Sequence, residues 1–512
     1  MSQTAFDSPS QAMVDEAPGG ASVKIVLAAV ALSLLFASLG QTIVSTALPI
    51  IAADLGGIDN LTWLITAYLL ASTVAAPVSG KLGDLFGRKA VMQGAIAIFV
   101  VGAVIAGLAP SMGILIAGRA VQGLGGGSLI VVSMAVVGDV LPPRDRGKAQ
   151  GILGAVFGVS TVLGPLIGGF LVEALSWHWI FFVNLPVGAL AFVVIAAALE
   201  TPAPGIRPRI DYAGAACLAT FLSAIVLIAN MGGSAVPWVS GTMALLLAIA
   251  VCALAGFVAA ERRASQPILP LELFRNNTFL VVNGVGFFVG VAMFGTITFM
   301  PLYLQVVQGV TPTVSGLFLL PMMGGLIAAS MAAGQLMSRT GRYKLLPIIS
   351  TAILAMSLLT MTALSSETSL WVIAAGMLGI GLGLGPVFSV GVAAIQNAVP
   401  ARMLGVGTAS ANMFRLIGGS IGTAAFGAIF ASGLSANIAG HISGDLSGGV
   451  RSVSAEMVAS LPAADRVTVL EGFSNALHPI FFAGAVLAVL ACLLSLRLRE
   501  LPLGTTLPGA RP

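Results

Sequence analysis

Long apolar runs recur along the whole chain, and each is about as long as a helix that crosses a lipid bilayer. A hydrocarbon core about 30 Å thick needs roughly 20 apolar residues in one helix. Of the 512 residues, 57% are hydrophobic and only 8% are charged, whereas about 25% of the residues in soluble domains are charged. The runs are apolar almost throughout and do not alternate residue by residue, which favours helices over barrel strands. The sequence therefore predicts an all-α polytopic membrane protein.

Polar breaks separate these runs into fourteen predicted membrane-spanning helices. The first run has the composition of a cleavable signal, but equivalent runs follow it, so we expect it to be retained. An even number of spans places both chain ends on one side of the bilayer. The expected helices cover residues 23–48, 63–80, 90–108, 113–138, 149–172, 179–199, 212–230, 239–259, 278–304, 314–337, 345–364, 370–398, 405–432 and 477–497.

Basic residues indicate which side that is. If the N-terminus is cytoplasmic, the segments on its side hold nineteen of the 23 Lys and Arg residues, while the opposite side holds only Arg451 and Arg466. The excess of basic residues in short cytoplasmic loops predicts that both termini are cytoplasmic. The net charge of +4 is therefore explained by membrane topology, and it gives no indication of nucleic-acid binding.

An internal repeat divides the chain into two halves. The segments GKLGDLFGRK at 80–89 and GQLMSRTGRY at 334–343 share four residues at one offset, and both are expected in cytoplasmic loops. Such parallel repeats are typical of transporters built from two related bundles. The predicted organisation is a disordered cytoplasmic tail (1–22), a six-helix bundle (23–200), two inserted helices with flanking cytoplasmic loops (201–276), a second six-helix bundle including the extracytoplasmic loop 433–476 (277–497) and a cytoplasmic tail (498–512).

Further motifs follow one another in a fixed order. They are WLITAYLLA at 63–71, AGRAVQGLGGG at 117–127, GDVLPPRDRGKAQG at 138–151, LGPLIGG at 163–169, WHWIFFVNLPVG at 177–188, PLYLQVVQGVTPTVSGLFLLP at 301–321 and FRLIGGSIG at 414–422. Together with GKLGDLFGRK, this ordered set resembles the major facilitator superfamily, and within it the fourteen-helix drug:proton antiporter branch of EmrB/QacA-type multidrug exporters.

The resemblance implies a major facilitator fold, with two six-helix bundles, two inserted helices and a site between the bundles. It also implies a multidrug efflux antiporter of the bacterial inner membrane, which exports amphipathic compounds by alternating access in exchange for protons. A second hypothesis is a dedicated exporter of an endogenous lipid or secondary metabolite, with non-standard or no proton coupling. The family default is a monomer, and a periplasmic adaptor is one reading of the 433–476 loop, with a solvated cap as the other.

The 80–89 segment is predicted to form a conformational latch. Its glycines permit a tight turn, and its charges lie where helices meet at the cytoplasmic face. The resemblance implies that the acid of this segment lies near the start of the 405–432 helix, and that its arginine reaches an acid at position 139. The alternative is a simple topology anchor. The predicted latch consists of Gly80, Asp84, Gly87, Arg88, Lys89 and Asp139.

The segment LGPLIGG is predicted to interrupt its helix. Pro165 lacks a backbone donor, and Gly164, Gly168 and Gly169 let a neighbouring backbone approach closely. The segment resembles the antiporter motif, which shapes helix packing and limits leak. From the residues alone, ordinary small-residue packing is the alternative.

Polar residues inside apolar helices are candidates for a proton pathway or for the wall of a cavity. A guanidinium within a membrane helix is costly unless it faces protein or water. Pairing with backbone carbonyl groups is the alternative role for the arginines. The candidates are Gln41, Thr42, Arg119, Gln122, Gln396, Asn412 and Arg415.

No acid lies at the middle of a predicted span. The first-helix motif of the resembled branch usually carries an aspartate where this chain has Gly40. A proton pathway must therefore use an acid near a membrane boundary, such as Asp54, Asp139 or Glu173. His178 is a further titrating candidate or a surface anchor.

The two arginines without a central acid predict a positively biased pocket. We therefore expect neutral or weakly anionic amphipathic substrates to be accepted at least as readily as cations. Met and Phe residues at 287–300 suit a broad apolar pocket, although lipid contact and helix packing are alternatives.

The sequence does not support the other classes of protein that we considered, an ATP-driven pump and a membrane-embedded enzyme. The chain has no GxxxxGK[ST] loop of an ATP-driven pump and no HExxH metal motif. Its GxSxG match, GGSIG at 418–422, lies within a predicted apolar helix and not at the strand-to-helix turn of a nucleophile elbow. Cys217, Cys252 and Cys492 all lie in apolar runs and are expected to serve packing. We expect no enzymatic activity, cofactor or metal.

Overall fold

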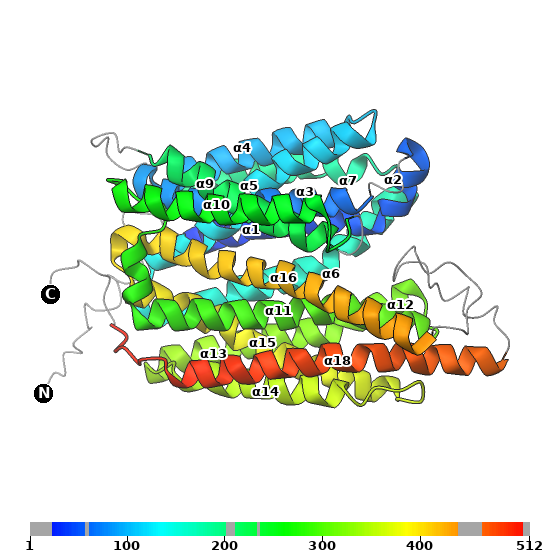
Figure 1. Cartoon of the computed structure of the whole chain (residues 1–512). Helices are drawn as coiled ribbons and strands as arrows, with labels where there is room; N and C mark the ends of the chain where they lie inside the picture. Colours follow the sequence, from blue (N-terminus) through cyan, green and yellow to red (C-terminus); the bar gives the residue numbers. More distant parts are fainter. Residues whose placement is uncertain (1–22, 57–60, 201–209, 233–235, 439–462, 505–512) are drawn as a thin grey trace, which may run out of the picture.

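The computed structural model describes residues 23–56, 61–200, 210–232, 236–438 and 463–504. Within these ranges the chain is helical apart from short connections and one isolated β-bridge between Gly232 and Val236. Long apolar helices run side by side along one direction (Figure 1), so the predicted all-α polytopic fold is confirmed. The predicted tail 1–22 and residues 201–209, 439–462 and 505–512 of the predicted loops and tail lie outside the described residues.

The first group of helices lies within residues 23–200. Its cores are apolar and tightly packed, and the ring centroids of Phe36 and Phe99, both fully buried, lie 4.5 Å apart. The group consists of α1 (Val23–Thr42), the 3-10 turn η1 (Ile43–Thr46), α2 (Leu48–Leu55), α3 (Leu61–Phe86), α4 (Arg88–Gly107), α5 (Met112–Val140), α6 (Pro143–Ala174), α7 (Trp179–Phe182) and α8 (Asn184–Ala198).

The second group of helices lies within residues 271–504 and has its own continuous apolar core. Side-chain caps begin several of its helices, as at Asn276 and Thr311, which accept hydrogen bonds from backbone N–H groups of the first turn. The group consists of η3 (Leu271–Arg275), α11 (Asn277–Val306), α12 (Pro312–Leu317), α13 (Leu319–Thr340), α14 (Leu345–Met361), α15 (Leu370–Ala398), η4 (Ala401–Met403), α16 (Leu404–Ile438) and α18 (Ala463–Leu496).

The inserted pair is α9 (Tyr212–Met231) and α10 (Gly241–Arg263). The two helices pack on each other, and α9 also packs on α3 of the first group and α16 of the second. Leu222 and Phe257 join the apolar core of the second group. The Lys81 ammonium donates to the Gln266 side chain at 3.2 Å, which ties α3 to the segment after α10.

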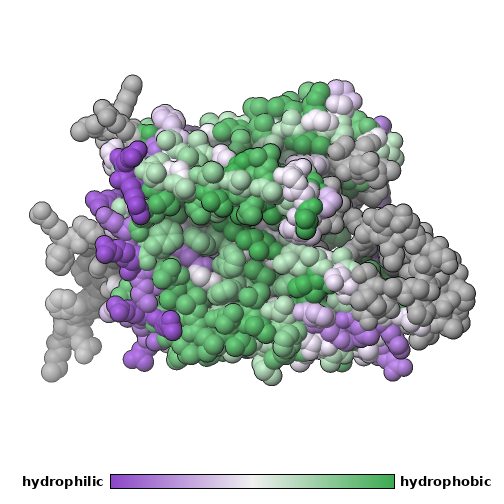
Figure 2. Space-filling view, in the orientation of Figure 1, coloured by the Kyte–Doolittle hydropathy of each residue, from purple (hydrophilic) through white to green (hydrophobic). Residues whose placement is uncertain are grey.

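Thirteen described helices are long and apolar enough to cross a membrane. The remaining predicted span coincides with α14, an apolar helix of 17 residues that packs against α15 and α18. Large apolar side chains such as Phe170, Leu245 and Trp371 are exposed on the outside of the helices. Figure 2 shows the resulting apolar band beside a hydrophilic end. A soluble monomer rarely exposes so large an apolar surface, so this band is the part that faces lipid.

The latch segment differs from its predicted form. It was expected to be a loop at 80–89, but α3 continues to Phe86 and α4 begins at Arg88. Gly87 alone makes the turn, with a φ of 86° that favours glycine. The expectation that Gly80 contributes to the turn is wrong because Gly80 serves helix packing: a Cβ there would lie 2.6 Å from the Gly405 carbonyl oxygen.

Two further predictions about helix ends are wrong. The expected loop 433–476 is helical at both of its ends, because α16 extends to Ile438 and α18 begins at Ala463. Residues 463–476, which were expected to belong to this loop, are thus continuous with the last span. Pro165 does not interrupt its helix, since α6 runs unbroken from Pro143 to Ala174. A proline removes one donor, and the bonds on either side keep the helix intact.

Candidate functional site

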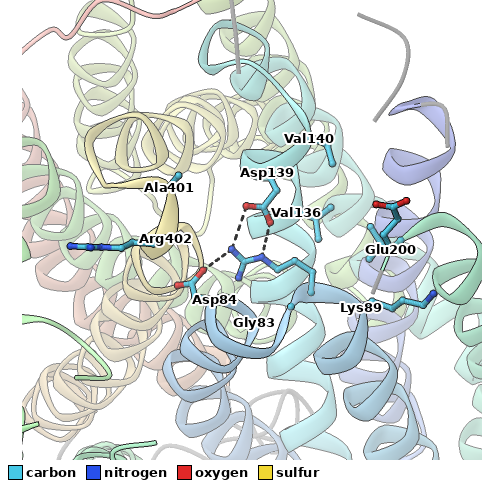
Figure 3. Close-up of a pocket in the computed structure, with 12 residues that line it drawn as sticks. Gly83, Asp84, Lys89, Val136, Asp139, Val140, Glu200, Ala401 and Arg402 are labelled. Carbon is cyan, nitrogen blue, oxygen red and sulfur yellow. Dashed lines mark hydrogen bonds and ion pairs between the residues drawn. The ribbon is translucent and has the colours of Figure 1, made fainter. Parts of the chain in front are cut away.

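Arg88 joins two acids at the end of the helices that holds Arg88, Lys89, Arg144 and Arg402, which we call the basic end. Its Nη2 lies 2.6 Å from Oδ1 of Asp84 and its Nε lies 2.7 Å from Oδ2 of Asp139. Figure 3 shows the two carboxylates turned toward the guanidinium between them. They border a cavity of about 290 Å³, which Lys89, Glu200 and Arg402 also line.

Asp84 also reaches across to the second group of helices. Its carboxylate accepts hydrogen bonds from the backbone N–H groups of Gly405 at 2.8 Å and Val406 at 3.0 Å. These N–H groups begin α16, where the helix dipole favours a negative charge. The side chain of Asp84 is only 2% exposed. The structure thus brings Asp84 to the start of α16 and Arg88 to Asp139, and Gly80 permits the close approach of α3 and α16.

A second set of contacts, which the sequence analysis missed, joins α6 to α13. Arg144 donates from Nε to the Ser338 carbonyl oxygen at 2.6 Å and from Nη2 to the Arg339 carbonyl oxygen at 2.7 Å. The Ser338 hydroxyl donates to Asp145 at 2.7 Å. A cation here binds the C-terminal carbonyls of a helix, which is the reverse of the arrangement at Asp84. At the offset of the internal repeat, Ser338 corresponds to Asp84.

A buried polar network lies between these two sets. Arg146 donates to the carbonyl oxygens of Gln396 at 2.8 Å and Gly138 at 2.7 Å. The Gln396 amide donates to the Met134 carbonyl oxygen at 2.9 Å and to Thr408 at 3.0 Å. Gln396, which we predicted to face a cavity, is instead buried in this network in the described conformation.

Together these contacts form a hydrogen-bonded seal between the two groups of helices. The Asp84, Arg144 and Arg146 contacts all lie at the basic end, near the ends of α3, α5, α13 and α15. Close backbone packing continues inward along α6 and α13, where a Cβ on Gly151 would lie 2.8 Å from the Ser330 carbonyl oxygen. The structure is therefore closed at its basic end.

Arg119 lies in α5 and is 1% exposed. Its Nη1 donates to the Gly40 carbonyl oxygen at 2.8 Å and to the Gln122 side chain at 2.7 Å, and its Nε donates to the Leu64 carbonyl oxygen at 3.2 Å. The guanidinium carbon lies 4.4 Å from the centre of the Tyr68 ring. Of the two roles considered for this residue, the described conformation has the pairing with carbonyl groups.

Gly40 has no room for a side chain. A Cβ there would lie 2.2 Å from Cζ of Phe99. The phenyl ring thus fills the space in which the resembled branch carries an aspartate. Among the described residues, no carboxylate forms an ion pair with Arg119 in this region, since both described ion pairs are those of Arg88.

The antiporter motif packs against the end of α1. Thr42 donates to the Ser160 carbonyl oxygen at 3.1 Å, and a Cβ on Gly164 would lie 2.0 Å from the Thr42 hydroxyl oxygen. A Cβ on Gly168 would lie 2.4 Å from the Ile43 carbonyl oxygen. Gly169 differs, because a Cβ there meets nothing within 4 Å. Gln41 is half-buried beside Thr42.

Arg415 lies in α16 with few partners. Its Nη2 donates to the Asn412 side chain, and its guanidinium carbon lies 4.1 Å from the centre of the Phe388 ring. The residue is partly exposed, whereas Asn412 is buried. Among the described residues no carboxylate pairs with it.

The titrating candidates at the opposite end fall into one group and one separate residue. The Trp177 indole donates to the Asp54 carboxylate at 2.8 Å, and its ring stacks on that of His178 with centroids 3.7 Å apart. Asp54 is exposed and His178 is half-buried. Glu173, near the end of α6, is also exposed.

The segment after α18, predicted as part of a cytoplasmic tail, is docked at the basic end in its described part. Glu500 accepts from the backbone N–H of Tyr343 at 3.0 Å, and the Tyr343 hydroxyl donates to the Arg499 carbonyl oxygen at 3.0 Å. The Gly504 carbonyl oxygen accepts from the backbone N–H of Arg144 at 3.2 Å. Burial raises the pKa of Tyr343. The segment therefore touches both groups of helices.

The described part of the chain holds no cluster of metal-ligating side chains and no disulfide. No group of three or more His, Cys, Asp or Glu side chains there lies together as a metal site. Cys217, Cys252 and Cys492 are free thiols, with Cys252 exposed in the apolar band.

Comparison with known proteins agrees with this architecture. The family model described as Major Facilitator Superfamily matches residues 30–423. The chain is 40% identical over 479 residues to the "Uncharacterized MFS-type transporter Rv1877" of Mycobacterium tuberculosis, covering 94% of this chain and 70% of that protein. It is 39% identical over 407 residues to the "Multidrug transporter protein MdtP" of Bacillus subtilis, covering 79% of this chain and 75% of that protein.

The fold is also similar to solved structures. The structure of the proton:xylose symporter XylE superposes with a TM-score of 0.61 at 14% identity, covering 93% of this chain and 96% of that one. At such low identity the similarity concerns the fold alone. The family match and the two relatives place the sequence, and the superposition agrees with the helical arrangement. The chain belongs to the major facilitator superfamily of membrane transporters.

Proposed function

We propose that this protein is a secondary active efflux transporter that exports amphipathic, drug-like compounds by alternating access, in exchange for protons. The observation that carries the proposal is the seal at the basic end, which is made of a few charge-assisted hydrogen bonds between two groups of helices. Such contacts can be exchanged as rigid groups rock. The similarity to a protein named as a multidrug transporter supports the choice of substrates.

The proposed latch consists of Gly80, Asp84, Gly87, Arg88, Lys89 and Asp139. Asp84 holds α16 directly, because its carboxylate accepts from the Gly405 and Val406 N–H groups. Arg88 donates to both Asp84 and Asp139, and so fixes the position of the Asp84 carboxylate. Opening the basic end requires these N–H groups to leave the carboxylate. Charge-assisted bonds of this kind each contribute about 1.5–3 kcal/mol, so the latch biases the equilibrium without locking it.

The proposed coupling ion is the proton, carried by acids near the membrane boundaries. Asp54 and His178 share contact with Trp177 at one end, and Asp139 lies at the other, half-exposed beside Arg88. Loss of the ion pair between Asp139 and Arg88 would loosen the latch. Arg119, Gln122, Gln41 and Thr42 lie along the first group and are proposed to shape the path between these ends.

The proposed location is the cell membrane, with the basic end in the cytoplasm. The basic side chains gather where α4 and α6 begin, and the positive-inside rule assigns that end to the cytoplasm. In this orientation the described conformation is closed to the cytoplasm. We propose a monomer that acts on small amphipathic substrates. For the 433–476 segment, contact with a periplasmic adaptor is the alternative to a solvated cap.

Reconstitution in vesicles tests the proposal. A pH gradient is imposed with and without a membrane voltage, and both proton flux and the movement of amphipathic compounds are followed. If the protein exchanges compounds for protons, the pH gradient should drive movement of the compounds, and protons should move across the membrane in the opposite direction. Compound movement that is indifferent to both gradients would remove the antiport assignment.

A second candidate function is the dedicated export of an endogenous lipid or secondary metabolite without standard proton coupling. The observation that favours it is the position of Phe99. Its ring fills the space beside Gly40 that the first-helix aspartate of the resembled branch would need. Substrate profiling separates the two functions. A single compound class moved at equal rate with and without a pH gradient supports the dedicated exporter.

A further inference from the structure

Arg415 lies at mid-depth of the membrane. It stands 11 residues after Leu404, the first residue of α16 at the basic end, which is about 16 Å along a helix that rises 1.5 Å per residue. A hydrocarbon core is about 30 Å thick, so this guanidinium is near its centre. A charge at that depth is tolerated only where it faces protein or water.

Arg119 and Arg415, the two arginines at the candidate sites inside the apolar helices, differ in their hydrogen bonding. Arg119 is 1% exposed and donates to two carbonyl oxygens and a glutamine. Arg415 is partly exposed and donates to Asn412 alone among the described residues, so its Nε and Nη1 have donors to offer. Arg119 is therefore satisfied by the protein itself, whereas Arg415 has donors left for a solvent molecule or a ligand.

The direction of Arg415 follows from its neighbours on α16. Thr408, Asn412 and Arg415 are spaced four and three residues apart, so they lie on one face of the helix. Thr408 bonds Gln396 in the polar network of the seal. Arg415 therefore stands about two turns beyond the seal, between α16 and α15, and farther from the basic end than the seal.

The Phe388 ring fixes the plane of the guanidinium. The ring of Phe388, on α15, lies 4.1 Å from the guanidinium carbon, and Asn412 holds Nη2. A guanidinium held flat on a ring and bonded at one nitrogen presents its remaining edge in a fixed direction. Such an edge matches the paired oxygens of a carboxylate, sulfonate or phosphate.

We infer that Arg415, with Asn412 and Phe388, forms a recognition site for the anionic group of an amphipathic substrate. This inference rests on the proposed export function and names the substrate class for it. The bound anion supplies the negative charge that no described acid provides at this depth. The apolar part of the substrate lies against the aromatic and aliphatic side chains around Phe388.

Equilibrium binding tests this site without requiring transport. The purified protein in lipid nanodiscs is titrated with 8-anilinonaphthalene-1-sulfonate and with N-phenyl-1-naphthylamine, which has the same rings but no charge, and empty nanodiscs give the background. Arg415→Gln is expected to weaken binding of the sulfonate by roughly 10- to 100-fold, the range for a bond to a charged group, and to leave the neutral probe unchanged. Arg415→Lys keeps the positive charge but lacks the planar guanidinium that can donate two parallel hydrogen bonds, so it is expected to retain part of the affinity.

Arg263→Gln is the matched control, because it removes the same charge from an exposed position at the end of α10. It is expected to change neither probe. Unchanged neutral binding in Arg415→Gln also shows that the variant is folded. The inference is overturned if the wild type does not bind the sulfonate, if Arg415→Gln leaves sulfonate binding intact, or if it weakens both probes equally.

Transport in vesicles distinguishes failure of the site from failure of the export function. Sulfonate binding that depends on Arg415, without movement of either compound under any gradient, leaves the site standing and removes the exporter. Movement of the neutral compound with no dependence of sulfonate binding on Arg415 leaves the exporter standing and removes the site.

Discussion

The Nη1 of Arg119 donates to the carbonyl oxygen of Gly40 at 2.8 Å. In the resembled branch this position of the first helix usually carries an aspartate, whose carboxylate could pair with a nearby cation. Here the backbone of the same residue accepts the bond, and Phe99 occupies the space beyond the Cα. The chain thus keeps a cation in this region without keeping an acid.

Gly40→Asp is expected to destabilise the protein. Its Cβ would lie 2.2 Å from Cζ of Phe99, and overpacking of this kind costs about 1–3 kcal/mol. The measurement is thermal unfolding of the purified variant. Phe99→Ala opens the space at its own cost, so the double variant should lose less stability than the sum of the two single variants. A strictly additive double variant would show that Phe99 does not exclude the acid.

Asp84→Asn is expected to open the basic end more often. The change removes the charge that faces the start of α16 and Arg88, and bonds to charged groups contribute about 1.5–3 kcal/mol. Spin labels at Ala90 and Leu345, exposed at the basic end on the two groups, report the separation. A longer distance population should grow in the variant. Glu272→Gln, which neutralises an exposed acid before α11, serves as the control and should leave the distances unchanged.

Arg144→Gln is expected to shift the same distances in the same direction. It removes two charge-assisted bonds to the end of α13, of 2.6 and 2.7 Å. Because these contacts share no residue with Asp84, the effects on the opening free energy should add in the double variant. If Arg144→Gln leaves the distances of the Asp84→Asn protein unaltered, the α6–α13 contacts carry no part of the seal.

Arg119→Gln is expected to reduce stability and to leave substrate charge preference unchanged. The carbonyl groups of Gly40 and Leu64 lose their donor, and buried unsatisfied groups cost about 1–3 kcal/mol. Thermal unfolding measures the loss, and the sulfonate and neutral probes measure the preference. A selective loss of sulfonate binding would instead place Arg119 in the substrate site.

The docking of residues 498–504 is expected to weaken at high pH. Burial raises the pKa of Tyr343, so its neutral form is the one that stabilises the docked segment. This contribution is complete below the ordinary tyrosine pKa of about 10 and is lost as the pH rises through the raised value. A spin label at Pro502 should become mobile in that alkaline range. Tyr343→Phe cannot ionise, so its label should show no such transition, and an identical transition in both proteins would assign it elsewhere.

Much of the fold follows from the sequence, because each apolar run is local information. A run of about 20 apolar residues forms a helix in lipid whatever surrounds it, since its backbone must bond within itself. The helices at 370–398 and 212–230, for example, were predicted to within a residue of α15 and α9. The helix ends near Phe86, Ile438 and Ala463 were not, because glycine and polar residues continue a helix when neighbouring helices pack on them.

The sequence by itself determined that this protein is a bundle of apolar helices, that its basic side chains mark one end, and that two arginines lie inside spans without a central acid. Only the tertiary structure decided which arginine is satisfied. Arg119 finds carbonyl groups 79 and 55 residues away in the chain, Gly40 is closed by Phe99, and Arg144 reaches α13 across 194 residues. The physical reason is that a helix is fixed by bonds four residues apart, while the partner of a buried charge is fixed by which helices pack together.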